Sequence, residues 1–132
     1  MANPNLIKKL LIKPGMRLAV LNAPAGHLEN LGPLPEGAHI TQDPDGALDF
    51  VQLFIKNRDE YERLGATAIR AVKPDGLLWI CYPKKSSGVE SDLDRDVVWK
   101  MLVPTGLRPV TQIAIDEVWS ALRFRPVEKV KP

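Results

Sequence analysis

The sequence predicts a three-layer α/β domain with a mostly parallel, twisted sheet and a C-terminal antiparallel hairpin. Short apolar runs alternate with amphipathic segments as far as residue 103, which is the order typical of parallel strands joined by helical crossovers. Two further apolar runs follow with only Asp116 and Glu117 between them, and so short a connection joins antiparallel neighbours. A length of 132 residues, of which 45% are hydrophobic, suits one such domain.

The N-terminal part predicts a helix, a strand and an irregular stretch. Apolar residues share one face of a helix over residues 4–12. After a Pro-Gly turn, residues 16–21 form an apolar run suited to a buried strand. Glycines and prolines recur in residues 22–37, so that at most about two helical turns fit there. A very short strand over 38–41 and a turn over 43–46 follow.

The middle of the chain predicts strand, helix and strand in succession. Residues 48–55 (LDFVQLFI) read as a strand, and residues 59–72 as a helix with Asp59 as its N-cap. The sequence KPDG at 73–76 ends that helix. Residues 77–82 (LLWICY) are the strongest candidate for a buried strand.

The C-terminal part predicts a polar loop over 83–91 and a helix over 93–103 that Ser91 or Asp92 caps. The two hairpin strands then cover 108–115 and 118–125. We therefore expect one domain over residues 1–126 and a flexible tail over 127–132.

Composition excludes several classes of protein. A formal net charge of +2 is too small to indicate a nucleic acid or a membrane as partner. No run approaches the ~20 apolar residues of a membrane-spanning helix. The single cysteine, Cys81, permits no internal disulfide bond, which fits a reducing compartment. The expected location is cytoplasmic.

Several segments resemble class I methyltransferases, whose core is Rossmann-like. Residues 13–18 (KPGMRL) are similar to the lead-in to their first strand, and residues 48–51 (LDFV) to their fourth. Residues 71–80 (AVKPDGLLWI) resemble their fifth strand with the turn before it. The resemblance implies a reduced methyltransferase-like topology, because a helix and a strand are missing after the short second strand. Residues 79–87 and 119–126 also resemble a family of small bacterial proteins of unknown function, which implies no activity.

The loop after the first strand departs from the methyltransferase pattern. In that family an acidic residue precedes a glycine-rich loop, which lets the cofactor approach the backbone closely. Here Val20 stands in the place of the acid, Asn22 and Pro24 stand in the places of two glycines, and Gly26 alone matches. The prediction is therefore that no cofactor binds. The alternative is S-adenosylmethionine held by Asn22, Ala23 and Gly26.

Ligands of open α/β sheets bind beyond the carboxyl ends of the strands. On this fold those ends are residues 22–26, 55–56, 82–87 and 116–119. The loop after the strongest strand offers two amines and two hydroxyls from Lys84, Lys85, Ser86 and Ser87. Such a set suits a small anion such as phosphate. An ordinary solvated loop is the alternative interpretation.

The last strand predicts an interaction surface. Val118, Ser120, Leu122 and Phe124 alternate with Trp119, Ala121, Arg123 and Arg125. A strand covered on both sides is apolar on both faces, so Arg123 indicates a face that no helix fully covers. A protein partner or a second copy of the chain would bind there, with Trp119 and Arg123 as contacts. The alternative is that carboxylates or water satisfy Arg123.

Other polar residues indicate no chemistry. His27 and His39 lack the spacing of a metal site, so no metal is expected. Either could serve as a general base, because histidine titrates near neutrality, but no nucleophile or orienting carboxylate is identifiable, and both are interpreted as surface or loop residues. Acidic residues between 92 and 96 suit the start of a helix. Cys81 lies in an apolar strand, where a thiol is inert.

Three functions remain open. The first is a non-catalytic domain that binds a protein or a small anion. The second is a small S-adenosylmethionine-dependent methyltransferase with an atypical cofactor loop. The third, least favoured, is a nucleic-acid-binding protein with a basic surface that includes Lys84, Lys85, Arg123 and Arg125.

Overall fold

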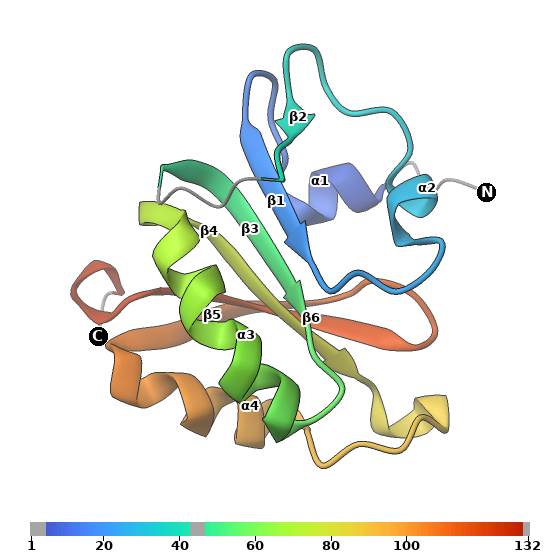
Figure 1. Ribbon diagram of the computed structural model, residues 1–132, viewed down its shortest axis with the longest axis vertical. Helices are drawn as coiled ribbons and strands as arrows, with labels where there is room; N and C mark the ends of the chain where they lie inside the picture. Colours follow the sequence, from blue (N-terminus) through green and yellow to red (C-terminus); the bar gives the residue numbers. More distant parts are fainter. Residues whose placement is uncertain (1–4, 43–46, 131–132) are drawn as a thin grey trace.

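The computed structural model describes residues 5–42 and 47–130, and its helices and strands follow the predicted order (Figure 1). The strands are β1 (Arg17–Leu21), β2 (His39–Ile40), β3 (Leu48–Phe54), β4 (Val72–Pro83), β5 (Leu107–Ala114) and β6 (Trp119–Pro126). The helices are α1 (Leu6–Leu10), α2 (His27–Leu31), α3 (Arg58–Ala71) and α4 (Arg95–Leu102), with short 3₁₀ turns at Lys85–Ser87, Val103–Thr105 and Val127–Lys129. The turn predicted over 43–46 and the end of the predicted tail, 131–132, lie outside the described residues.

The strands form one mixed sheet in the order β2-β1-β3-β4-β6-β5. β1 pairs in parallel with β2 and β3, and β3 pairs in parallel with β4. β6 is antiparallel to both β4 and β5. The predicted fold class, a mostly parallel sheet with a C-terminal antiparallel hairpin, is therefore confirmed.

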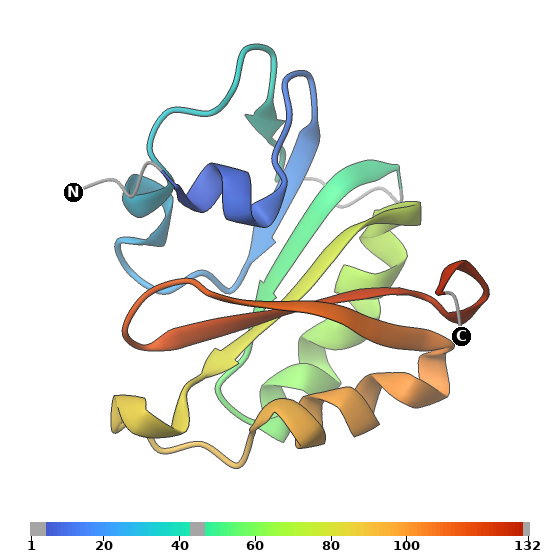
Figure 2. The same ribbon diagram turned by 180° about the vertical axis from the view of Figure 1, so that it is seen from behind.

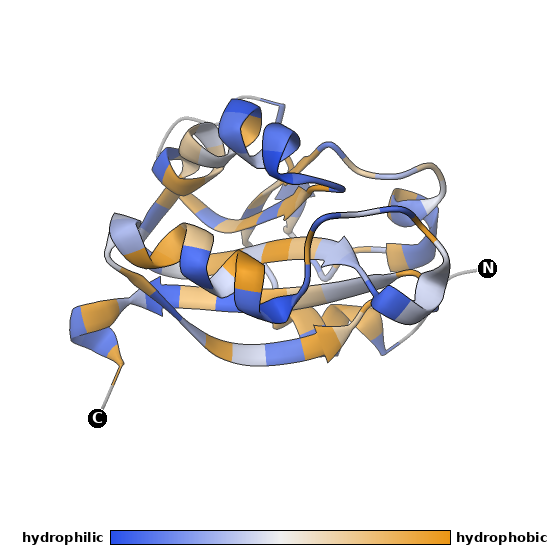
Figure 3. Ribbon diagram, turned by 90° about the horizontal axis from the view of Figure 1, so that it is seen from below, coloured by the Kyte–Doolittle hydropathy of each residue, from blue (hydrophilic) through white to orange (hydrophobic). Residues whose placement is uncertain are grey.

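Helices lie on both sides of the sheet and form two hydrophobic cores with it (Figures 1 and 2). One core lies under α3 and α4 and includes Leu53, Ile80 and Leu122. The other lies under α1 and α2 and includes Phe50 and Trp79. Hydrophobic residues recur along the central strands in Figure 3, as expected for strands that are buried on both faces.

The N-caps of α3 and α4 differ from the predicted ones. Asn57 caps α3 by accepting a hydrogen bond from the Glu60 amide, so Asp59 lies in the first turn instead. Asp94 caps α4 by accepting from the Val97 amide, so the prediction of Ser91 or Asp92 was wrong. In both cases the cap is an Asx residue in extended conformation, three residues before the amide it binds.

The predicted turn over residues 73–76 lies inside β4 in the structure. Asp75 adopts a left-handed backbone conformation (φ 56°), and the register between β3 and β4 shifts at this level. The segment is therefore an irregular start of the strand and not a separate turn.

The last described residues continue past β6 as a 3₁₀ turn over Val127–Lys129. Its first amide, at Val127, donates to the carbonyl of Gly106 at 2.8 Å. None of the helices within the described residues has the length and apolar character needed to cross a lipid bilayer.

Candidate functional site

The carboxyl ends of β1, β3 and β4 lie at one rim of the sheet, because these three strands are parallel. The strand order reverses between β1 and β3, since β2 lies on one side of β1 and β3 on the other. Open α/β sheets bind their ligands in the crevice at such a reversal. The residues that follow β1 and β3 are therefore candidates for a ligand-binding site.

Asn22 has a left-handed backbone conformation at the position where the methyltransferase pattern leads us to expect a glycine. Its φ of 59° is left-handed, a region that side chains with a Cβ atom disfavour and that asparagine tolerates best. Its Nδ2 donates to the carbonyl oxygen of Phe54 at 2.8 Å. The Asn22 side chain therefore reaches from the end of β1 to the end of β3, across the crevice.

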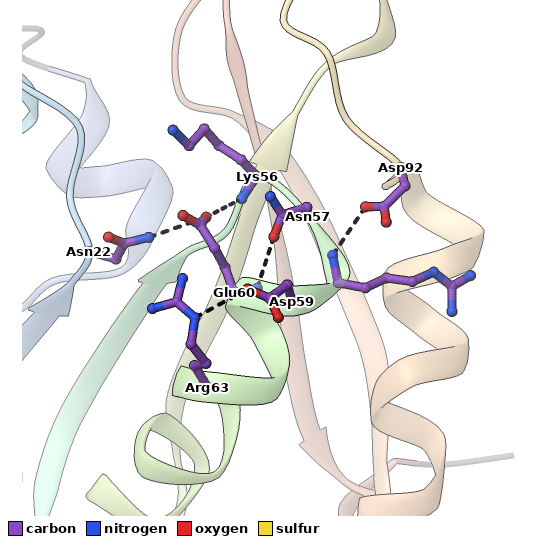
Figure 4. Close-up of polar contacts among 8 residues, drawn as sticks. Asn22, Lys56, Asn57, Asp59, Glu60, Arg63 and Asp92 are labelled. Carbon is purple, nitrogen blue, oxygen red and sulfur yellow. Dashed lines mark hydrogen bonds and ion pairs between the residues drawn. The ribbon is translucent and has the colours of Figure 1, made fainter.

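A polar network holds this side of the rim (Figure 4). Glu60 Oε1 accepts from the Lys56 amide at 2.6 Å and from Asn22 Nδ2 at 3.4 Å. Asp92 accepts from the Arg58 amide at 3.0 Å. The first turn of α3 and the loop before α4 are thus tied to the end of β3, and Asn22 joins that network.

We expect Asn22→Ala to lower the free energy of unfolding by about 1–2 kcal/mol, because alanine is strained at a left-handed φ and the bond to Phe54 is lost. Asn22→Gly loses the same bond but fits the backbone, so its loss is about 1 kcal/mol or less. Chemical denaturation of the parent chain and the two variants measures these losses in free energy of unfolding. Equal losses in both variants would contradict the role given to the backbone.

A cavity of about 310 Å³ lies beside the turn between β1 and α2. It is lined by Pro24, Ala25, Gly26, His27, Asn30, Asp116, Val118 and Trp119. The turn supplies one wall and the β5–β6 connection supplies the other. The cavity is therefore at the rim, on the side of the turn that faces the hairpin.

His27 is a buried wall of this cavity, 4% exposed, so its interpretation as a surface or loop residue was wrong. Its Nε2 lies 3.1 Å from Gln52 Oε1. Because that oxygen can only accept, Nε2 carries the proton and Nδ1 is left as an acceptor. Burial lowers the pKa of His27, while the bond to Gln52 and the charge of Asp116 oppose that shift. The imidazole is therefore neutral near pH 7.

The environment of His27 continues into the sheet. Gln52 Nε2 donates to Cys81 Sγ at 3.4 Å, and burial raises the pKa of that thiol to about 12. Cys81 is therefore an inert thiol, as predicted. Phe54 packs edge-on against His27 at 4.6 Å and against Trp119 at 5.1 Å between ring centroids. These aromatic contacts hold the two cavity walls together.

Asp116 shapes the hairpin end of the cavity. Its Oδ1 accepts from the amides of Val118 and Trp119, both at 2.8 Å. In the described part of the chain, no cation forms an ion pair with this carboxylate. The cavity therefore combines one unneutralised carboxylate, a neutral imidazole and an indole.

The structure brings some of the predicted site residues together and separates others. Gly26 and Trp119, predicted for different roles, line the same cavity. Asn22 lies in the adjacent crevice, and Ala23 follows it in the turn. Arg123 lies four residues beyond Trp119 along β6.

Several polar groups of the predicted anion loop already form hydrogen bonds or ion pairs with other groups of the protein. Lys85 Nζ lies 3.4 Å from Asp94 Oδ2. The hydroxyl of Ser87 donates to the Lys84 carbonyl at 2.6 Å, and the Lys84 amide donates to the Val118 carbonyl at 2.7 Å. The anion site predicted at Lys84, Lys85, Ser86 and Ser87 thus stays a prediction.

Sequence reasoning missed Asn30 and Gln52 and did not foresee that His27 is buried. It placed Asp116 at the rim only as part of the segment 116–119. A glutamine in the middle of the apolar run LDFVQLFI was the available signal, because a buried amide needs a polar partner. Across residues 5–42 and 47–130, no group of three or more His, Cys, Asp or Glu side chains is placed to hold a metal ion.

No family model matches the sequence, and no curated protein matches it significantly. The fold is similar to an S-adenosylmethionine-dependent methyltransferase from Aquifex aeolicus, with a TM-score of 0.59, 14% identity, and 92% of this chain and 93% of that chain covered. It is also similar to DhpI, solved in complex with S-adenosylhomocysteine, with a TM-score of 0.62 and 13% identity. That match covers 92% of this chain and 82% of DhpI.

A third similar structure is 1,6-didemethyltoxoflavin-N1-methyltransferase from Burkholderia thailandensis, with S-adenosylhomocysteine bound. Its TM-score is 0.58 at 12% identity, and the match covers 92% of this chain and 74% of that one. At such identities the likeness concerns the fold. The chain has the α/β fold of class I S-adenosylmethionine-dependent methyltransferases.

Proposed function

We propose that this chain binds an S-adenosyl compound at the rim of its sheet and is a small methyltransferase. The observation that carries the proposal is the cavity beside the β1–α2 turn, which is lined by the carboxylate of Asp116 and the indole of Trp119. A carboxylate and an indole both attract cations. S-adenosylmethionine carries two cationic groups, a sulfonium and an ammonium.

The neutrality of His27 supports a cationic ligand as well. A protonated imidazole would repel a cation and offset Asp116, whereas burial keeps this one uncharged near pH 7. Nδ1 is also free to accept a proton. His27 would therefore serve as the general base for a hydroxyl or amine acceptor that enters the cavity.

The similar structures support the class of ligand. Two of them hold S-adenosylhomocysteine, and their fold is the fold of this chain. The departure concerns the crevice, because Asn22 spans from β1 to β3. We place the cationic portion of the ligand on the hairpin side of the turn for that reason. A cavity of about 310 Å³ would hold only part of so large a ligand.

Calorimetric titration with S-adenosylmethionine, S-adenosylhomocysteine and adenosine tests the proposal. We expect both adenosyl amino acids to bind, and adenosine to bind more weakly because it lacks the ammonium group. Thermal unfolding provides a second measurement, since a ligand at 100 times its Kd stabilises a protein by about 2.7 kcal/mol. Absence of binding by either adenosyl amino acid at millimolar concentration would overturn the proposal.

Asp116→Asn is the decisive variant. Asparagine keeps the Oδ1 acceptor for the Val118 and Trp119 amides, so the turn is preserved while the charge is lost. We expect the Kd of S-adenosylmethionine to rise by about tenfold or more. The exposed neighbour Glu117 gives the control Glu117→Gln, which removes the same charge and leaves the Kd unchanged. Equal effects of the two variants would show a general charge effect and no cavity site.

A further inference from the structure

One half of the sheet is open on the side of α1. In Figure 2 the β5–β6 hairpin faces the viewer, and no helix lies over it. On the opposite side, β6 contributes Leu122 and Phe124 to the core under α3 and α4. The alternate residues of β6 therefore point to the open side.

Three arginines gather on this open face. Arg108 of β5 is directly opposite Arg125 of β6, and residues directly opposite each other share a face of the sheet. Arg123 is two residues before Arg125 and is on the same face. All three side chains are half-buried. Two strands thus bring three guanidinium groups within reach of one another.

The described residues supply these arginines with one carboxylate. Asp75 binds Arg125 through two hydrogen bonds, Nε to Oδ1 at 2.9 Å and Nη2 to Oδ2 at 2.8 Å. Arg108 and Arg123 form no ion pair with any residue in the described ranges. Two guanidinium charges on this face are therefore left without a paired carboxylate among the described residues, and Lys129 adds a further positive charge near Asp75.

Arg123 is the least satisfied of the three. Its Nε is buried and has no hydrogen-bond partner among residues 5–42 and 47–130. Burial and the nearby charge of Arg125 lower the pKa of Arg123. Like charges on facing strands are unfavourable, and a buried donor without an acceptor is costly. The face is arranged in the way expected of a site whose anion is supplied from outside.

We propose that the open face of β5–β6 binds a phosphate monoester, with Arg108 and Arg123 as its contacts. The two unpaired guanidinium charges match a dianion, whereas a carboxylate would neutralise only one of them. A guanidinium offers a planar fork that fits phosphate oxygens. Arg108 is opposite Arg125, and Arg123 is two residues from Arg125 on the same face, which places both side chains where they can reach one phosphate. Asp75 holds Arg125 at the edge of the site.

The site is separate from the rim cavity, and the proposal does not depend on binding of an adenosyl compound. Titration of the full chain with inorganic phosphate at pH 7.5, followed by the NMR signal of the Arg123 Nε–H group, is the test. We expect that signal to shift with saturation. No shift up to tens of millimolar phosphate, a range well above ordinary metabolite affinities, would overturn the proposal.

Two variants and a control distinguish recognition by the guanidinium fork of Arg123 from general attraction to a positively charged surface. Arg123→Gln raises the Kd about tenfold or more, and Arg123→Lys, which retains the charge and preserves the fold, raises it to an intermediate value. Arg70→Gln removes an exposed charge in the last turn of α3 and leaves the Kd unchanged. An equal effect of Arg70→Gln would overturn the proposal. So would tighter binding of a single-stranded oligonucleotide than of phosphate, because a phosphodiester polymer would then be the ligand.

Discussion

Trp79→Ala is expected to lower the free energy of unfolding by about 3–5 kcal/mol, the range for removing a fully buried large aromatic side chain. Trp79 is 0% exposed and lies in the core under α1 and α2. Its indole Nε1 also donates to the carbonyl oxygen of Leu10 at 3.1 Å. One side chain therefore fills the core and fastens the end of α1 to β4. Urea denaturation followed by circular dichroism measures the loss.

The matched control is Trp79→Phe, which keeps an aromatic ring in the core and removes the bond to Leu10. Leaving that buried carbonyl without its donor costs about 1–3 kcal/mol. We expect hydrogen exchange in residues 6–10 to become faster in this variant, because α1 has only five residues and depends on its contacts with the sheet. If Trp79→Phe lowered the free energy of unfolding as much as Trp79→Ala does, the hydrogen bond to Leu10, and not the packing of the ring, would be the main contribution of Trp79 to stability.

The fold could be predicted because its signals are local and redundant. Apolar runs over 16–21, 48–55 and 77–82 became β1, β3 and the buried part of β4. The alternation along the last strand separated Leu122 and Phe124 from Trp119 and Ala121, which belong to different cores in the structure. The helix caps were less predictable, since several Asx residues precede α3 and α4 and only backbone geometry decides which of them accepts the bond.

The cavity could not be predicted in the same way, because it depends on how two distant segments meet. Gly26 and His27 come from the turn after β1, and Asp116 and Trp119 come from the β5–β6 connection. The sequence predicted that residues 22–26 and 116–119 lie at one rim of the sheet, and the cavity confirms that they meet there. It gave Gly26 and Trp119 different roles, however, and did not predict that His27 is buried between them. His27 lies in a single helical turn, too short for a periodicity that would have shown its buried side.

Stability is expected to fall as the pH drops below about 6.5, the ordinary pKa of histidine, and His27 is the reason. Burial lowers the pKa of His27 in the folded protein, so the folded state keeps the imidazole neutral at pH values where the unfolded chain binds a proton. As the pH falls, the state that binds more protons is stabilised, and here that is the unfolded state. The slope approaches about 1.4 kcal/mol per pH unit at most for one proton. Urea midpoints between pH 7.5 and pH 5.5 measure it.

Two variants identify the group responsible. His27→Gln keeps a donor for Gln52 Oε1 and cannot titrate, so its stability is flat over this pH range. His39→Gln, at an exposed position on β2, keeps the dependence of the parent chain. Carboxyl side chains ordinarily have pKa values of about 4, which lie below this window. A slope that persists in His27→Gln would refute the assignment. It would also remove the argument that a neutral imidazole faces the cavity, because the same buried ring carries both conclusions.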